Sequence, residues 1–319
     1  MTVVEQLTKA TQDNKTLFSF ELLPPRKGNS IQKVFDTIDV LREFDPSYIN
    51  ITSHRDEVEF VPSGDGTYKK RIARKRPGTV AVAAAINHEY KIPVVPHVIC
   101  GGFTPEETEN ALIDLNFLGI HDLLMLRGDR SPRHEWIPAD NEHHYALDLI
   151  SQVNKINEGQ YLDGTLAESF DTPFSFGVAG YPEKHEEAPN MDSDIYYLKK
   201  KVEAGAQYVV TQMFFDNQKY FQFVDRVRAA GITVPVVPGL KPITRMSQLN
   251  ILPQIFKVDI PEDLASEIRK CKSTQEVEKV GVEWGVKQGR ELIQAGVPSL
   301  HFYTMMASKS VSAIAKQIF

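Results

Sequence analysis

Cysteine is scarce in this chain, and long apolar runs are missing. Only Cys100 and Cys271 occur among the 319 residues, too few for a disulfide framework or a cysteine-based zinc site. The longest uninterrupted apolar run, Val80–Ile86, is far shorter than a membrane span. The stretch from Met1 to Lys15 is polar and of mixed charge, unlike a signal peptide. We therefore expect a soluble protein of the reducing cytoplasm.

A basic excess and several familiar motifs are also missing. The 36 Lys and Arg residues against 42 Asp and Glu residues give a net charge of −6, which argues against nucleic acid or an anionic membrane as a partner. There is no phosphate-binding P-loop, no HExxH zinc motif and no GxSxG nucleophile elbow. The nine His residues lack zinc-ligand spacing, so no metal is expected. Gly64-Asp65-Gly66 lacks the third glycine of a Rossmann fingerprint, so any dinucleotide must be held differently.

The chain does contain a repeated pattern: a short apolar run, a break rich in Gly, Pro or Asp, and a longer stretch of helical period. It predicts eight strands: Leu17–Glu21, Tyr48–Thr52, Val94–Ile99, Asp122–Leu126, Phe174–Ala179, Tyr208–Gln212, Val234–Val237 and Leu300–Tyr303. Amphipathic helical stretches lie between them: Ile31–Phe44, Lys69–His88, Pro105–Leu118, Glu142–Asn157, Ser193–Ala204, Asn217–Ala230 and the long Arg245–Ala295 region. Eight such units favour a (βα)8 TIM barrel over an open doubly wound sheet, which periodicity alone does not exclude.

No linker-like tract divides the chain, so we expect one domain over residues 1–319. His54–Thr67 and Arg130–Asn141 are then insertions on the side where the strands end. In such a barrel the active site forms at the carboxyl ends of the strands. The polar or turn residues there are Glu21, Thr52, His97, Arg127, Asp129, Tyr181, Gln212, Pro238, Gly239, Tyr303 and Thr304.

Glu21 closes the first predicted strand. Strand alternation puts it on one face with Ser19, opposite Phe18 and Phe20. Flanking aromatic and leucine side chains would desolvate the carboxyl group and raise its pKa, which suits a general acid. The alternative is a carboxylate that pairs with an Arg or Lys at the barrel mouth.

Other strand-end residues have two interpretations each. In Arg127-Gly128-Asp129 the Arg could bind phosphate and the Asp could balance a cation, or the three form a surface turn. His97, within a strand, is more often a satisfied core residue than a ligand. Gln212 could bind a heterocycle through its amide or brace a loop.

Two basic clusters stand out. Residues 69–76 hold Lys69-Lys70-Arg71 and Arg74-Lys75-Arg76, for which a solvated helix face is a better interpretation than an anion site. Lys199-Lys200-Lys201, shortly after Asp194, is the more plausible phosphate site.

Seven segments, in this order along the chain, point to one family. They are Phe18-Ser19-Phe20-Glu21-Leu22-Leu23-Pro24-Pro25-Arg26, Pro96-His97-Val98-Ile99-Cys100, Leu126-Arg127-Gly128-Asp129, Gly180-Tyr181-Pro182-Glu183-Lys184-His185-Glu186-Glu187-Ala188, Thr211-Gln212-Met213-Phe214-Phe215-Asp216, Pro238-Gly239-Leu240-Lys241-Pro242 and His301-Phe302-Tyr303-Thr304. In this ordered set the chain resembles the 5,10-methylenetetrahydrofolate reductase family, of the bacterial type with a catalytic domain only. The large regulatory domain of animal relatives is absent, so feedback by S-adenosylmethionine is not expected.

The resemblance implies a (βα)8 barrel that holds FAD non-covalently and makes 5-methyltetrahydrofolate in one-carbon and methionine metabolism. Glu21 would protonate N10 of the folate, opening its five-membered ring to an iminium whose methylene carbon takes up hydride from the flavin. Asp129 would tune the flavin potential and stabilise the cation. NADH or NADPH would use the same face as folate in alternating half-reactions.

The resemblance also implies binding positions. Folate contacts would fall on Gln212, Gln248, Leu252 and Tyr303. Flavin contacts would fall on Thr52, His97, Leu126, Arg127, Gly128, Asp129, Tyr145, Ala146, Tyr181, His185, Asp194, Lys200 and Lys201. The chain departs from the family at Leu252, often Phe, and at Ala307, often Arg, where Lys309 could supply the charge. His54–Pro77 is longer and more basic than in the family, and a homo-oligomer follows by analogy.

Two other functions remain open at this point. A barrel aldolase or lyase would use Lys241, just beyond the seventh strand, as a Schiff-base lysine. A catalytically silent homologue would act as a partner subunit in one-carbon metabolism. The joint presence of Glu21, Asp129 and Gln212 argues against the silent homologue.

Overall fold

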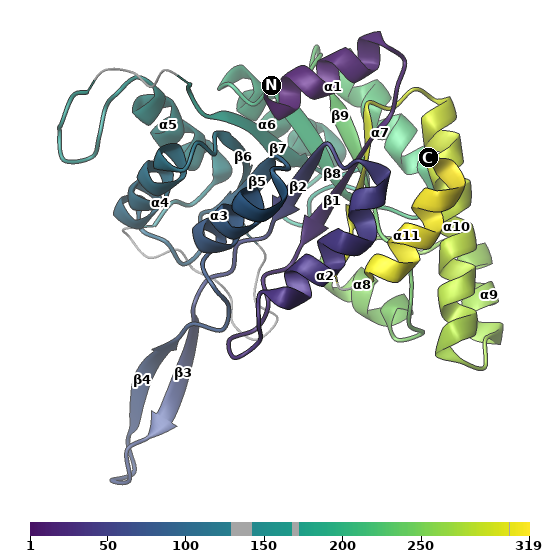
Figure 1. Cartoon of the computed structure of the whole chain (residues 1–319), viewed down its shortest axis with the longest axis horizontal. Helices are drawn as coiled ribbons and strands as arrows, with labels where there is room; N and C mark the ends of the chain where they lie inside the picture. The colour runs from purple at the N-terminus through teal and green to yellow at the C-terminus, as the bar shows by residue number, and fades with distance from the viewer. Residues whose placement is uncertain (129–141, 168–171, 306) are drawn as a thin grey trace.

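Eight parallel strands close into a barrel in the computed structural model, which describes residues 1–128, 142–167, 172–305 and 307–319 (Figure 1). The strands follow one another around it in the order β1-β10-β9-β8-β7-β6-β5-β2. Their bounds are β1 Leu17–Leu22, β2 Tyr48–Ile51, β5 Val94–Ile99, β6 Asp122–Leu126, β7 Ser175–Gly180, β8 Tyr208–Met213, β9 Val236–Leu240 and β10 Ser299–Tyr303. The predicted (βα)8 TIM barrel is confirmed.

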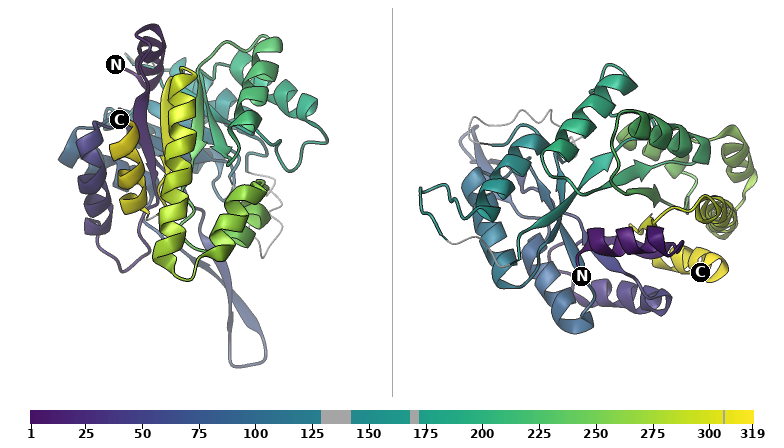
Figure 2. Two further views of the ribbon diagram at one scale, coloured as in Figure 1. Left: turned by 90° about the vertical axis from the view of Figure 1, so that its right-hand side faces the viewer. Right: turned by 90° about the horizontal axis from the view of Figure 1, so that it is seen from above.

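Helices cover the outside of the barrel (Figure 2). They are α2 Gln32–Leu41, the short 3-10 helix η1 Arg42–Phe44, α3 Thr79–Tyr90, α4 Pro105–Phe117, α5 Ala146–Asn157, α6 Met191–Glu203, α7 Asn217–Ala229, α8 Gln248–Phe256, α9 Glu262–Lys270, α10 Thr274–Gln294 and α11 Ser308–Ile318. The predicted Arg245–Ala295 region thus contains three helices. No helix among the described residues is long and apolar enough to cross a bilayer.

The prediction of a helix over Lys69–His88 was wrong in its first part. Strands β3 Glu57–Pro62 and β4 Tyr68–Ala73 form an antiparallel hairpin, and α3 begins only at Thr79. The Gly64-Asp65-Gly66 turn reverses the chain, because both glycines adopt positive φ. The residues of the first basic cluster therefore lie on and just after a hairpin strand, not on a helix face.

Two further comparisons with the sequence concern the predicted insertions and the start of the seventh barrel strand. The hairpin occupies the predicted insertion after the second strand, whereas the predicted insertion Arg130–Asn141 lies outside the described residues. The seventh barrel strand begins at Val236, two residues later than predicted. Pro235 precedes it and accepts a hydrogen bond from Val209 N at 2.8 Å.

Helix α1, Val3–Gln12, was not predicted, and it closes the amino-terminal end of the barrel. Val3 and Leu7 are fully buried and pack with Tyr48 and other residues of the barrel interior. Val3 N also donates to Asp122 Oδ1 at 3.0 Å. The helix lies across the barrel when the molecule is seen from above (Figure 2). Because this end is plugged, a site for a small molecule is left to the opposite end.

The barrel interior changes character along its axis. Near α1 it is apolar, with Val95, Leu124, Tyr208, Val210 and Val237 in one cluster. Toward the strand ends it becomes polar, and the buried polar side chains there are Ser19, Asn50, His97, Lys241 and His301. A larger apolar cluster fills the space between the strands and the surrounding helices. The polar part of the interior leads directly to the carboxyl ends of the strands.

Candidate active site

Glu21 lies inside the barrel near the end of β1, on the same face as Ser19, as the strand alternation predicts. Its neighbours in the sheet register are Asn50 of β2 and Tyr303 of β10. Its side chain is 15% exposed, and Oε2 lies 3.6 Å from Nε2 of His97. Thr304 Oγ1 donates to the backbone oxygen of Glu21 at 2.7 Å, which ties the ends of β1 and β10 together. The carboxylate is thus held near the mouth, largely sheltered from water.

His97 is a buried neighbour of Glu21. Burial, with smaller contributions from His301 and His54, lowers the pKa of His97 to about 3. The imidazole is therefore neutral near pH 7, and its contact with Glu21 is not an ion pair. Its Nε2 also lies 3.3 Å from Asn50 Nδ2. Because a neutral imidazole is a poor proton donor at this pH, Glu21 is the better candidate for a general acid.

Lys241 reaches the same region from just beyond β9. Leu240 pairs with Phe302 of β10, so the next residue lies at the level of Tyr303. Lys241 is only 4% exposed. Burial lowers its pKa to about 8, and attraction to Glu21 partly opposes the shift. From the sequence, Lys241 is a candidate for Schiff-base chemistry only, and its position near Glu21 was not predicted.

A second cluster joins the loops after β6 and β7. Arg127 Nε donates to His144 O at 3.1 Å, and its guanidinium lies 5.1 Å from the ring centroid of Tyr145. The same guanidinium forms an ion pair with Glu187. Gly128 has φ +94° and lies against Ile99, so a side chain here would be strained. Asp129, the predicted flavin-side carboxylate, lies outside the described residues.

The predicted flavin positions after β7 fall into two groups. Asp194 Oδ2 accepts a hydrogen bond from His185 N at 2.8 Å. The rings of Tyr181 and His185 meet edge-on, with their centroids 4.7 Å apart. Lys201 Nζ donates to Ala179 O at 3.3 Å, and burial lowers its pKa. Lys200 lies apart from both groups: its ammonium is exposed and forms an ion pair with Glu203 at 3.0 Å.

Three other predicted flavin positions surround these clusters. Thr52 Oγ1 lies 3.0 Å from His54 Nε2 just after β2. Leu126 pairs with Ile99 in the barrel register. Ala146 is the first residue of α5, next to the Tyr145 ring that faces Arg127.

The predicted folate contacts already have partners within the protein. Gln212 Oε1 accepts from Met213 N at 2.9 Å. Gln248 Oε1 accepts from Thr244 N at 2.7 Å and Arg245 N at 3.0 Å. Both amide oxygens therefore brace backbone, and neither amide nitrogen makes a hydrogen bond within the part of the chain that the structure describes. The Tyr303 hydroxyl donates to Thr211 O at 2.6 Å.

The two positions that depart from the family pattern are placed differently from each other. Leu252 is 2% exposed and packs with Met213 and Phe215 in an apolar cluster beside the barrel. Ala307 is the N-cap residue of α11, and its N–H donates to Thr304 O at 2.6 Å. Lys309 follows on the exposed surface of that helix.

Glu183, two residues after Tyr181, was not singled out in the sequence. Its Oε2 accepts from Asp259 N at 2.7 Å. Its Oε1 is buried and has no hydrogen-bond partner among the described residues. Burial raises the pKa of Glu183 to about 7. The only sequence signal for this group was its place in the segment from Gly180 to Ala188.

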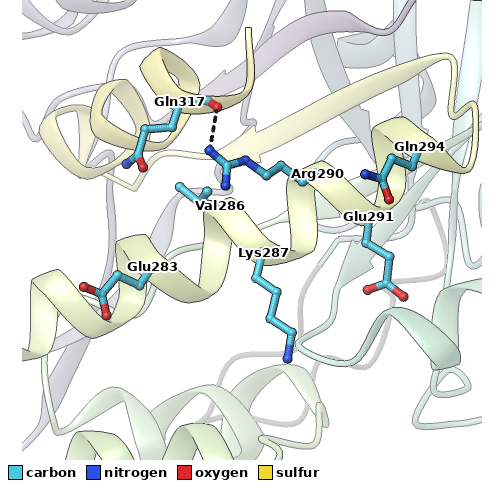
Figure 3. A pocket seen from close by; sticks show the side chains of 7 residues that line it. All are labelled: Glu283, Val286, Lys287, Arg290, Glu291, Gln294 and Gln317. Carbon is cyan, nitrogen blue, oxygen red and sulfur yellow. Dashed lines mark hydrogen bonds between the residues drawn. The ribbon is translucent and has the colours of Figure 1, made fainter.

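A separate groove of about 590 Å³ lies between α10 and α11, on the outer helical layer (Figure 3). Arg290 Nη2 donates across it to Gln317 O at 3.2 Å. Its other lining residues include Glu283, Lys287 and Glu291, so charges of both signs alternate there. It contains none of the strand-end residues, and we do not assign the chemistry to it.

The strand-end groups fit a flavin dinucleotide in their chemistry. The Thr52 hydroxyl, the Arg127 guanidinium and the buried Lys201 ammonium offer donors and positive charge for carbonyl and diphosphate oxygens. Lys201 makes one hydrogen bond in the described structure although an ammonium has three donors. Tyr145 and Tyr181 add aromatic faces from the same two loops.

A sequence model of the family described as methylenetetrahydrofolate reductase matches residues 6–319 of this chain. The chain belongs to the methylenetetrahydrofolate reductase family. The (βα)8 barrel and the strand-end groups described above are thus those of a member of this family.

Individual reductases are similar over nearly all of the chain. Methylenetetrahydrofolate reductase 1 of Schizosaccharomyces pombe is 29% identical over 320 residues, which cover 100% of this chain and 48% of that protein. Methylenetetrahydrofolate reductase (NADH) 1 of Arabidopsis thaliana is 29% identical and covers 98% of this chain and 50% of its own. The chain thus spans about half the length of these relatives. The 5,10-methylenetetrahydrofolate reductase of Escherichia coli is 29% identical, over 93% of this chain and 88% of its own.

A solved structure supports the barrel assignment. A protein from Clostridium thermocellum, described as binding two copies of 5-methyl-5,6,7,8-tetrahydrofolic acid, matches with a TM-score of 0.57 and 13% identity. The match covers 98% of this chain and 99% of that one. At this level of identity the similarity concerns the fold.

Proposed function

We propose that this protein reduces 5,10-methylenetetrahydrofolate to 5-methyltetrahydrofolate in one-carbon and methionine metabolism of the cytoplasm, with FAD bound non-covalently and NADH or NADPH as the reductant. One observation carries the proposal beyond family membership. The Glu21 carboxyl group is 15% exposed at the mouth of the barrel, beside an imidazole that stays neutral near pH 7. A sheltered carboxyl group in this place can hold and donate a proton while a folate ring lies over the strand ends.

Each residue has a defined task in this proposal. Glu21 donates its proton to N10 of the folate, which opens the five-membered ring and leaves a cationic iminium. The amide nitrogens of Gln212 and Gln248 hydrogen-bond to the substrate, while their oxygens keep the loops in place. FAD, when bound, supplies the hydride for the methylene carbon. Arg127 and Lys201 hold its oxygens by charge and hydrogen bonds.

Asp129 is proposed as the carboxylate that balances the cationic iminium and tunes the flavin. Leu252 and Tyr303 line the folate region in the proposal. The other cofactor contacts are Thr52, His97, Leu126, Gly128, Tyr145, Ala146, Tyr181, His185, Asp194 and Lys200.

Glu21→Gln separates the two half-reactions. The amide keeps the size of the side chain but cannot donate a carboxyl proton. We expect the variant to retain FAD and to be reduced by NADH or NADPH at the wild-type rate. Folate-dependent reoxidation should fall by about 10²–10⁴-fold, the usual contribution of a general acid. Stopped-flow absorbance at the flavin band measures both steps, with NADH and NADPH compared in parallel.

The matched control is Glu283→Gln, a surface carboxylate on α10. It should leave both half-reactions unchanged. Wild-type rates of folate reduction in Glu21→Gln would remove Glu21 from the role of acid. A colourless wild-type protein that binds no added FAD would reject the proposed function altogether.

Lys241 supports a second candidate, a barrel aldolase or lyase. Its pKa of about 8 leaves part of the amine neutral near pH 7, as a Schiff-base lysine requires. Borohydride in the presence of a small carbonyl compound would trap such an adduct on Lys241, which mass spectrometry detects. Family membership favours the reductase, for which we expect no adduct. A silent partner subunit would show no flavin-dependent oxidation of NADH or NADPH.

A further inference from the structure

A two-stranded hairpin projects from the barrel at its mouth (Figure 1). We call the segment His54–Pro77, which contains β3 and β4, the arm. The two strands form a sheet of their own, paired from Glu57↔Ala73 to Pro62↔Tyr68. An isolated two-stranded hairpin is at best marginally stable in water, so its faces call for a covering layer.

One face of the arm is apolar. Val58 pairs with Ile72 and Pro62 pairs with Tyr68, and cross-strand partners lie on the same face of a hairpin. Phe60 lies between them on this face. Val58, Phe60, Tyr68 and Ile72 are 43%, 63%, 66% and 68% exposed. Exposed side chains of this size form an apolar patch on the order of a few hundred Å², the size of the largest patch on many soluble proteins, which often has a function.

The opposite face is charged but internally neutralised. On this face Glu59 forms an ion pair with its cross-strand partner Arg71. At the base of the arm, just outside the two strands, Lys75 also pairs with Glu59, and Arg74 Nε lies 3.3 Å from Asp56 Oδ1. Cations that already have carboxylate partners are less available to a polyanion. The apolar face has no covering layer within the described structure, and its four large exposed apolar side chains favour a protein surface over a nucleic acid.

The charge of the arm differs from that of the rest of the chain. It carries seven basic and four acidic side chains, a net +3, whereas the whole chain carries −6, which leaves −9 on the remainder. A second copy of the chain therefore offers a surface of opposite sign to the arm. Lys70, which faces Phe60 across the hairpin, adds a cation to the apolar face and fits such a surface.

We propose that the arm is a dimerisation element whose apolar face packs on a second copy of this chain. The arm emerges after β2, where Thr52 and Glu21 lie at or near the carboxyl ends of their strands. The partner that covers it consequently lies beside the mouth of the barrel. The proposal rests on the geometry and charge of the arm and stands independently of the reductase activity.

Sedimentation velocity on the full chain tests the proposal. Wild-type protein should sediment as twice its 36.0 kDa mass at micromolar concentration. The double variant Phe60→Lys/Ile72→Lys places two charges in the apolar face and should weaken the dimer by at least about 100-fold. The control Phe117→Lys changes an aromatic residue that is 90% exposed on α4 and should leave the dimer intact.

Amide hydrogen exchange on the wild type removes any dependence on how the variants fold. Protection of the amides of β3 and β4 should rise with protein concentration, while that of α4 should not. A wild type that stays monomeric at high micromolar concentration overturns the proposal, and so does protection of the hairpin that is independent of concentration. Equal dissociation of Phe117→Lys and the double variant would also overturn it. A monomer that binds nucleic acid through the arm would replace the proposed partner.

Discussion

Replacing Lys241 with Met is expected to stabilise the protein near neutral pH. Lys241 is 4% exposed, and burial lowers its pKa from 10.5 to about 8 even with Glu21 nearby. Methionine has a similar length and no charge to bury. The pKa of about 8 already includes the attraction between Lys241 and Glu21. The free-energy change worked out from this pKa therefore includes the loss of that attraction in the variant.

The size of the effect follows from proton linkage. The unfolded chain binds more protons than the native state between about pH 8 and 10.5, so stability rises with pH in that window. Below the folded pKa the full difference applies, which is about 3 kcal/mol at 1.36 kcal/mol per pKa unit. The gain of Lys241→Met over the wild type should therefore be about 3 kcal/mol at pH 7 and fall below about 1 kcal/mol at pH 10.

Urea denaturation at pH 7, 8, 9 and 10, followed by circular dichroism, measures this gain directly. Lys279→Met is the control, because that lysine is 78% exposed on α10 and should shift stability by less than about 0.5 kcal/mol. A gain at pH 7 that persists unchanged at pH 10 would refute the linkage argument. So would a variant that is less stable than the wild type at pH 7.

Two further predictions concern the ends of the barrel. Burial raises the pKa of Asp122 to about 6, so the stability it contributes below pH 4 is lost as pH rises through 6. Asp122→Asn keeps an acceptor for Val3 N and should raise the unfolding free energy at pH 7 by about 2–3 kcal/mol, with no gain near pH 3.5, as thermal or urea melts would show. Gly281→Ala should destabilise the protein by about 1–3 kcal/mol although alanine favours helices, because the new Cβ would lie 1.9 Å from Ile243 O. Urea melts measure this loss, with the exposed Glu278→Ala as the control. Equal stability of the two variants would contradict the packing around Gly281.

Much of the barrel and the place of Glu21 could be predicted from the sequence. The alternation of apolar runs with helical stretches favoured the (βα)8 fold, and the period of two in β1 put Glu21 on the same face as Ser19, which faces the barrel interior. These are local properties, since they depend on the direction of successive side chains along one strand or helix. The hairpin was missed because the basic residues that follow its turn fit a helical surface equally well when no tertiary context is given.

Only the tertiary structure decided which side chains meet. Closure of the barrel brings β10 against β1, so that Ser19 lies 3.0 Å from His301, 282 residues away. The pairing of β6 with β7 brings Arg127 to Glu187, and the closure of the barrel puts Lys241 near Glu21. It also lets the polar N-terminal stretch plug the barrel through Val3, 119 residues from Asp122. The sequence alone determined the fold class and the acidic side chain at the mouth; the charges around that side chain follow from long-range packing, which no local pattern encodes.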